Sequence, residues 1–335
     1  MPSKCINHGR VAFCFTLASS LWLAGNLHAS YIFQDIVNPG DTTFNQELGI
    51  NNVGAVSGYF GSGQMGHPNQ GYTVAPPGYS TFTSENFPGS VQTQVVGIDN
   101  SGATVGFWSN TNTGTDANFG FTDVGGTFTS VNDPSTPAGG LPVNQFLGIN
   151  DNGVAAGFYV DGSGNPQGYL YHIATQTFTP LTVSGANNST ATGIDNSGVI
   201  SGFYNNGTSD VAFIDNAGAF SFFQAFGDST QFFGINNTGY AVGTYQDGSG
   251  QFHGVLYNIA TQSFQSIDDP LAAAGAGNGA TLNGINNQDQ LVGFYANADG
   301  NTIGLLATSI PEPATVEFVG LALLVTAFGR KLKLL

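Results

Sequence analysis

The sequence predicts an all-β fold: a six-bladed β-propeller of four-stranded antiparallel blades, closed by the strand nearest the N-terminus. Three observations predict it: a composition suited to strands and tight turns, a motif that recurs six times, and a first strand that supplies what the last repeat lacks. Charged residues make up 8% of the 335-residue chain, which contains 49 glycines. Glycine accepts turn conformations and aromatic residues suit pleated sheets, while 41% hydrophobic residues provide the core that a disordered chain lacks.

Residues 1–30 are predicted to be a secretory signal peptide. Lys4 and Arg10 precede an apolar stretch at 11–24, and the small residue Ala29 marks a cleavage point of the usual kind. An uncleaved anchor helix is the alternative, which the shortness of the apolar stretch disfavours. We therefore expect the mature chain to be exported and to begin near Ser30.

One motif recurs through the segment that follows, residues 31–309. Its pattern is Gly-Ile-Asn/Asp-x-x-Gly-x-x-x-Gly-x-aromatic, and neighbouring copies start 41 to 51 residues apart. The starts are Gly49, Gly97, Gly148, Gly193, Gly234 and Gly284. Such a period is typical of solenoid and propeller repeats. The motif therefore predicts six copies of one structural unit.

Each copy predicts two strands joined by a tight turn. The Asn or Asp after the Ile is expected to accept a hydrogen bond from the backbone two residues on. These turn residues are Asn51, Asp99, Asn150, Asp195, Asn236 and Asn286. The next glycine should close the turn with a positive φ, a position held by Asp289 in the sixth copy. The last glycine of the motif falls inside the second strand and predicts close approach of a neighbouring backbone.

Two further strands complete each unit, and the ends of the array predict how it closes. In the third copy the segments 168–173 and 177–181 are strand-like and follow a polar turn at 161–165. The sixth copy stops after its third strand, at 302–307, whereas 31–39 resembles the fourth strands of other copies. A first strand that completes the last unit closes a ring and removes exposed sheet edges. An open solenoid is the alternative. The motif is similar to extracellular HAF-type repeats, a resemblance that implies no particular chemistry.

Residues 310–335 carry a tripeptide, an apolar stretch and a basic end. Pro311, Glu312 and Pro313 precede the stretch 314–329, and three basic residues follow it: Arg330, Lys331 and Lys333. The flanking prolines favour an extended segment that a processing enzyme can bind. This order of parts resembles the PEP-CTERM sorting signal, although Glu317 interrupts the apolar stretch and the stretch is short for a span.

The PEP-CTERM resemblance implies a partner and a location. The partner is an exosortase-type processing enzyme, and 314–329 would be a transmembrane helix that holds the chain transiently in the inner membrane. By the positive-inside rule the basic end is cytoplasmic, so the body is periplasmic before processing and at the cell surface or in the extracellular matrix afterwards. An ordinary C-terminal anchor is the alternative.

The distribution of charge excludes one class of partner. All five Lys and Arg residues lie in the terminal segments, whereas nineteen of the 21 acidic residues lie in 31–310. Nucleic acid is excluded as a partner because phosphate binding depends on Lys and Arg. Both cysteines, Cys5 and Cys14, lie in the signal segment, so the body has neither disulfides nor thiol chemistry.

The body offers little catalytic chemistry, and we predict no catalytic residue and no cofactor. His67, His172 and His253 do not cluster in the sequence and are expected to be surface polar residues. No Gly-x-Ser-x-Gly elbow and no His-x-x-x-His pair occurs. Calcium stays open as an alternative, because Asp161, Asp247 and Asp299 stand in Gly-rich turns with oxygen-bearing neighbours. Turn formation explains the same aspartates without a metal.

These features predict an exported, non-catalytic surface or matrix protein. The propeller face would bind polysaccharide or other surface proteins. A secreted glycan-cleaving enzyme on the same scaffold is the alternative, which a cluster of carboxylates in one blade only, facing the central mouth, would favour. A third hypothesis is an assembly subunit that associates through the faces of its blades.

Overall fold

The computed structural model describes residues 30–310, which form 24 β-strands and one short helix, η1 (Ala225–Gly227). None of the chain in this range forms a helix that is long and apolar enough to cross a membrane. The predicted signal peptide, the Pro311-Glu312-Pro313 tripeptide, the helix 314–329 and the basic end all lie outside the described residues, apart from Ser30 and Ile310 at the margins.

Sixteen strands form four separate blades, each an antiparallel meander of four strands in sequence order. The first is β2 (Asn45–Ile50), β3 (Val56–Phe60), β4 (Gln70–Val74) and β5 (Phe82–Ser84). The second is β6 (Gln92–Ile98), β7 (Thr104–Ser109), β8 (Phe119–Val124) and β9 (Thr127–Ser130). The third is β10 (Asn144–Ile149), β11 (Val154–Val160), β12 (Pro166–His172) and β13 (Thr177–Pro180). The fourth is β14 (Thr190–Ile194), β15 (Ile200–Asn205), β16 (Asp210–Asn216) and β17 (Ala219–Phe223).

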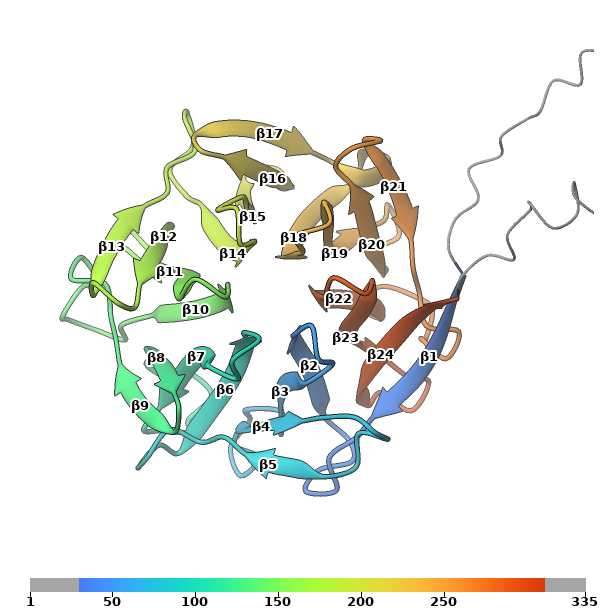
Figure 1. The fold of residues 1–335 in the computed structure, drawn as a ribbon, viewed down its shortest axis with the longest axis horizontal. Coiled ribbons are helices and arrows are strands. Elements are labelled where there is room, and N and C mark those ends of the chain that lie inside the picture. The colour runs from blue at the N-terminus through green and yellow to red at the C-terminus, as the bar shows by residue number, and fades with distance from the viewer. Residues whose placement is uncertain (1–29, 311–335) are drawn as a thin grey trace, which may run out of the picture.

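The other eight strands form a single sheet that contains the fifth and sixth repeat units. The fifth unit is β18 (Ser229–Ile235), β19 (Tyr240–Gln246), β20 (Phe252–Asn258) and β21 (Ser263–Ser266). The sixth is β22 (Gly279–Ile285), β23 (Gln290–Ala296) and β24 (Thr302–Ile310), joined by β1 (Ser30–Ile36). All strands together make an all-β propeller around a central axis (Figure 1).

The prediction of six separate blades is wrong, because one contact merges the last two units. β20 pairs with β22 in parallel through the single residue pair Phe252 and Gly279. Gly279 has a φ of 114°, and a Cβ on it would lie 1.8 Å from the backbone oxygen of Phe252. Only glycine permits that approach. The merger therefore depends on one residue outside the repeated motif.

The predicted pairing of the first strand with the last unit is confirmed. β1 runs antiparallel to β24 over seven residue pairs, from Ser30 with Ile310 to Ile36 with Gly304. Figure 1 shows the blue β1 alongside the red β24. The buried Ile36 lies in the same core cluster as Val56 of the first blade. The chain is therefore closed by its N-terminal strand.

The first glycine of each motif forms a ring around the axis. A Cβ on Gly97 would lie 3.1 Å from the Cα of Gly148, and the equivalent spacing in the other units is 3.1–3.3 Å. The ring is complete, because a Cβ on Gly284 would lie 3.2 Å from the Cα of Gly49. Backbones at the axis pack so closely that side chains are excluded. Sequence reasoning gave this glycine no role.

The last glycine of the motif has its predicted role. A Cβ on Gly243 would lie 1.9 Å from the backbone oxygen of Gln231, and the other five equivalents would lie 2.0–2.3 Å from theirs. Each faces a strand whose register shifts at a bulge, as at Phe232 and Gly234. Close backbone approach is therefore confirmed in all six units.

Candidate functional site

The six predicted turn residues lie at one end of the axis and form the turns expected of them. The side-chain Oδ1 of each accepts hydrogen bonds from the backbone N–H two residues on, at 2.8–3.2 Å, and four residues on, at 2.8–3.1 Å. The closing glycines have φ between 70° and 88°, and Asp289 has 56°. The turn role of these residues is therefore confirmed.

The residue after each turn residue forms a closed ring of hydrogen bonds that sequence reasoning missed. In every unit its backbone N–H donates to the side-chain oxygen of the equivalent residue in the next unit, at 2.7–3.0 Å. The members are Asn52, Asn100, Asp151, Asn196, Asn237 and Asn287. The available signal was an amide or carboxylate at this position in every copy.

This end of the axis is too narrow for a large ligand. The cavity between the turns has a volume of about 70 Å³, and the one beside the glycine ring has about 60 Å³. Such volumes hold only a few water molecules. The turn residues and their ring are therefore part of the framework of the propeller.

The opposite end of the axis carries a repeated pair of side chains on the first two strands of each unit. The first-strand member is Gln or Thr, and the second-strand member is aromatic in five units. The pairs are Gln46 with Tyr59, Gln94 with Phe107, Gln145 with Phe158, Thr190 with Phe203, Gln231 with Thr244, and Thr281 with Phe294. The small Thr244 replaces the aromatic ring in the fifth unit only.

A cavity of about 390 Å³ lies where that ring is missing. Three half-buried aromatic residues line it: Phe233, Phe252 and Phe294. The polar lining is Gln46, Gln231, Thr244, Asn278, Thr281, Asn283 and Thr302, and Leu48, Gly277, Gly279 and Ala296 complete the wall. No ionisable side chain is among them. Mixed aromatic and amide linings of this size are typical of small-molecule sites.

One wall of the cavity is the loop between β21 and β22, residues 267–278. The backbone N–H of Phe252 donates to the oxygen of Asn278 at 2.9 Å, and that of Gly277 donates to the oxygen of Gly250 at 2.9 Å. These bonds flank the pair Phe252 and Gly279 that merges the last two units. The same departure from repeat symmetry therefore builds the cavity wall.

The amide side chains of the lining differ in how far their polar atoms are paired. Asn283 Oδ1 is buried and has no hydrogen bond. Gln46 Oε1 accepts from the hydroxyl of Tyr59 at 2.6 Å, which leaves the amide N–H groups of Gln46 for a ligand. Gln231 Nε2 donates to Asp210 Oδ2 at 2.7 Å, which leaves its carbonyl oxygen. Both donors and acceptors are thus offered to a ligand.

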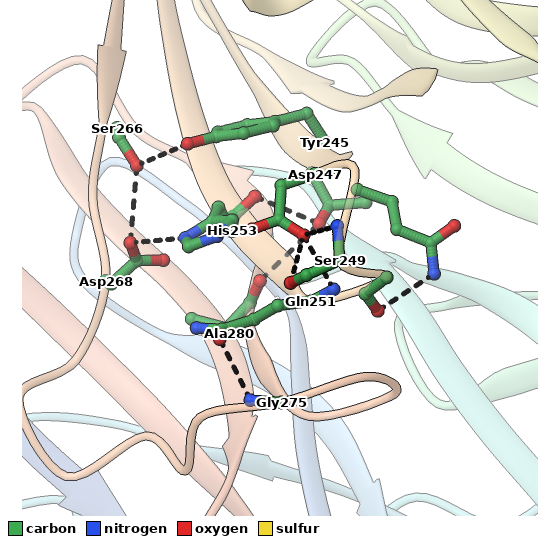
Figure 2. A network of polar contacts seen from close by, with 12 residues as sticks. Tyr245, Asp247, Ser249, Gln251, His253, Ser266, Asp268, Gly275 and Ala280 are labelled. Carbon is green, nitrogen blue, oxygen red and sulfur yellow. Dashed lines mark hydrogen bonds and ion pairs between the residues drawn. The ribbon is translucent and has the colours of Figure 1, made fainter. Parts of the chain in front are cut away.

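Behind this wall lies a polar network centred on His253 (Figure 2). His253 Nδ1 is 2.8 Å from Asp268 Oδ2, and His253 Nε2 is 3.4 Å from Asp247 Oδ2. The imidazole stacks on Tyr245 with ring centroids 4.9 Å apart. Burial alone would lower the pKa of His253, but the hydrogen bonds and charges of Asp268 and Asp247 raise it above its ordinary value. The side chain is 18% exposed, and its contacts with two carboxylates were not foreseen from the sequence.

The three calcium candidates lie in separate units. Asp161 and Asp247 each anchor a turn, because their Oδ1 atoms accept backbone hydrogen bonds at 2.8–3.0 Å from the residues two and four positions on. Asp299 does not, since Asn297 holds the anchoring position in its turn. Within residues 30–310 no three His, Asp or Glu side chains form a group that could hold a metal.

Two carboxyl groups that break the repeat symmetry lie away from the axial cavities, and Glu85 is only half-buried. Glu47 is fully buried, where burial raises its pKa, and accepts a hydrogen bond from the Tyr72 hydroxyl. Glu85 accepts from Thr104 at 2.8 Å, and burial, together with Asp123, raises the pKa of Glu85 to about 7. Neither residue lines the three axial cavities. The carboxylates that do line an axial cavity are Asp151 and Asp195, in the cavity between the turns.

Comparison with known proteins finds solved structures at low sequence identity. No family model and no curated sequence matches the chain. Among solved structures, TolB from Acinetobacter baumannii is 11% identical with a TM-score of 0.46, over 75% of this chain and 63% of TolB. Aleuria aurantia lectin is 10% identical with a TM-score of 0.44, over 84% of this chain and 99% of the lectin. Trypanosoma rangeli sialidase is 11% identical with a TM-score of 0.45, over 91% of this chain and 62% of the sialidase.

Proposed function

We propose that this chain is a non-catalytic binding protein that holds a neutral saccharide in the cavity beside Thr244. The observation that carries the proposal is the cavity of about 390 Å³ that lies where Thr244 replaces an aromatic ring. Small-molecule sites commonly have volumes of about 300–1,000 Å³.

The rest of the lining supports the same class of ligand. A pyranose has apolar C–H faces that pack on aromatic rings, and Phe233, Phe252 and Phe294 offer such surfaces. Its hydroxyls both donate and accept, which suits the free amide group of Gln46 and the free carbonyl of Gln231.

Charge favours a neutral ligand over an acidic one. The lining contains no cation, and residues 31–310 contain nineteen acidic residues with no Lys or Arg. An anionic polysaccharide would be repelled unless a divalent cation bridged the two. The absence of an ionisable group from the lining also supports binding without cleavage, because glycoside hydrolysis uses paired carboxyl groups.

The proposal includes a six-unit ring and a place at the cell surface. Six motif turns surround the axis, so we propose that the eight-stranded sheet serves as two blades of a six-bladed ring. Export rests on the signal-peptide pattern of residues 1–30, and processing by an exosortase-type enzyme rests on the resemblance of 310–335 to PEP-CTERM signals. Exopolysaccharide at the surface or in the matrix would then be the ligand.

A glycan array tests the proposed function. The full-length chain in detergent is applied to neutral and anionic oligosaccharides, with calcium and with a chelator. We expect binding to neutral glycans that does not depend on calcium, and no release of reducing ends from the bound glycans. Binding restricted to anionic glycans with calcium, or glycan cleavage, would contradict the proposal.

A further inference from the structure

We propose that His253 is a positioning residue for the saccharide cavity: its imidazolium joins Asp247 to Asp268 and thereby holds the loop 267–278 in place. The expected effect of His253 on ligand binding rests on the proposed function. The role of His253 in holding the loop does not.

His253 makes the two ion pairs found within residues 30–310. This range contains no Lys or Arg. A carboxylate in it can therefore form an ion pair only with a protonated histidine side chain. Asp247 lies in the turn after β19, and Asp268 follows β21. A single cation therefore connects two segments that are not directly paired in the sheet, because β20 lies between β19 and β21.

The turn held by Asp247 contacts the cavity wall. Asp247 Oδ1 accepts from Ser249 and Gln251, which shapes the turn 247–251. Gln251 Oε1 then accepts the backbone N–H of Gly275 at 2.9 Å (Figure 2). The preceding turn residue, Gly250, accepts a hydrogen bond at its backbone oxygen from the N–H of Gly277, a residue that lines the cavity.

Asp268 fixes the other end of the same loop. Its Oδ1 accepts the backbone N–H of Gly254 at 3.1 Å, and its Oδ2 accepts from Ser266 at 3.3 Å and contacts His253 at 2.8 Å. Asp268 is the second residue of the loop that forms the cavity wall. Both ends of the wall are therefore coupled to the charge on one imidazole.

The remaining titratable group that faces His253 is Tyr245, stacked on its ring from β19. Burial raises the pKa of Tyr245, with Asp268, Asp228 and Asp247 adding to the effect, so the phenol stays neutral where histidine titrates. The pKa of His253 is itself raised by its two carboxylates, against the effect of burial. Its contribution is therefore complete below the ordinary histidine pKa and is lost as pH rises through the raised value.

The third unit suggests a variant that keeps the geometry without the charge. Gln167 occupies the position of His253 and donates from Nε2 to Asp161 Oδ2 at 2.9 Å. His253→Gln should therefore retain the bond to Asp247 at every pH. His172→Gln removes a histidine outside the network and is the matched control.

Hydrogen exchange of the loop tests the inference without any ligand. Exchange of the full-length chain over 267–278 is measured at about pH 5.5 and about pH 8.5, on either side of the ordinary histidine pKa of about 6.5, and corrected for intrinsic rates. In the wild type and in His172→Gln, we expect exchange about two- to fivefold faster at the higher pH, the scale of partly exposed ion pairs. His253→Gln should show no such increase.

Two outcomes separate this inference from the proposed function. Equal pH dependence in the wild type and His253→Gln would overturn the positioning role, whatever the chain binds. Failure to bind any neutral oligosaccharide would overturn the proposed function and leave the exchange result standing. If cellohexaose or mannohexaose binds, its affinity should fall with rising pH in the wild type and not in His253→Gln.

Discussion

The side-chain amide of Asn286 donates a hydrogen bond to the backbone oxygen of Asn51, 3.0 Å away and 235 residues earlier in the chain. The same bond links Asn51 to Asp99, Asn150 to Asp195, and Asn236 to Asn286, at 2.9–3.0 Å. The bond from Asn286 closes the repeat array at the end of the axis where the motif turns lie. The pairing of β1 with β24 closes it within the eight-stranded sheet. These bonds from turn-residue amides to backbone oxygens form a ring that is incomplete at two places, because Asp99 and Asp195 have no amide to donate.

Replacing Asp99 by Asn should complete one gap in that ring. The new amide would donate to the backbone oxygen of Asn150, and a net gain of about 1 kcal/mol in unfolding free energy is expected from one such bond. Urea denaturation measures the change. Asp299→Asn, which removes the same charge from an exposed turn, is the control, and an equal gain in both variants would show that charge alone is responsible.

The glycine ring should not tolerate a methyl group. Gly148→Ala would place a Cβ 2.6 Å from the backbone oxygen of Thr192 and 3.1 Å from the Cα of Gly193, so a loss of about 1–3 kcal/mol is expected. Gly162 has open space around its Cβ position and serves as the control. Equal stability of the two alanine variants in urea denaturation would mean that the axis can relax.

Closure by β1 should contribute strongly to stability. Ile36 is 1% exposed in the core, whereas Ile32 on the same strand is 62% exposed. Ile36→Ala should cost about 2–5 kcal/mol, and Ile32→Ala should cost little. Thermal and urea unfolding of both variants measure this difference. A small effect of Ile36→Ala would show that the packing of β1 contributes little to holding the ring closed.

Glu85 should make stability depend on pH. Its pKa is raised from 4.5 to about 7, by burial first and by Asp123. The folded chain therefore retains a proton that the unfolded chain loses, and unfolding free energy should fall as pH rises from 4.5 to 7. At the equivalent backbone position other units carry Val131, Leu181 or Ile267, which are buried against the next unit.

Glu85→Leu tests this dependence. The variant should lose that part of the pH profile and be more stable than the wild type above pH 7, as measured by urea midpoints across the range. A profile identical to that of the wild type would assign the dependence to other groups.

The repeated features of this fold could be predicted from sequence, because they depend on local chemistry. An Asn such as Asn51 forms its turn with backbone groups two and four residues away, and the strand 31–39 matched the fourth strands of other units. These inferences needed only the repeat alignment.

The candidate site could not be predicted, because it consists of departures from the repeat. Thr244 differs from the other units at a single position, and Gly279 lies outside the motif. His253 contacts Asp247 and Asp268 only after three segments fold together. Which departure matters depends on contacts between units, and a single sequence does not contain them.

The central claim is that the cavity beside Thr244 holds a neutral saccharide, and filling that cavity tests it directly. Thr244→Phe restores the aromatic residue that the other five units carry, so the fold should accept it. Phe158→Ala, at the same end of the axis but outside the cavity, is the control. By titration calorimetry with the strongest neutral ligand from the array, Thr244→Phe should lose binding at least about tenfold, or about 1.4 kcal/mol, while Phe158→Ala keeps it. Unchanged affinity in a folded Thr244→Phe variant would contradict the account.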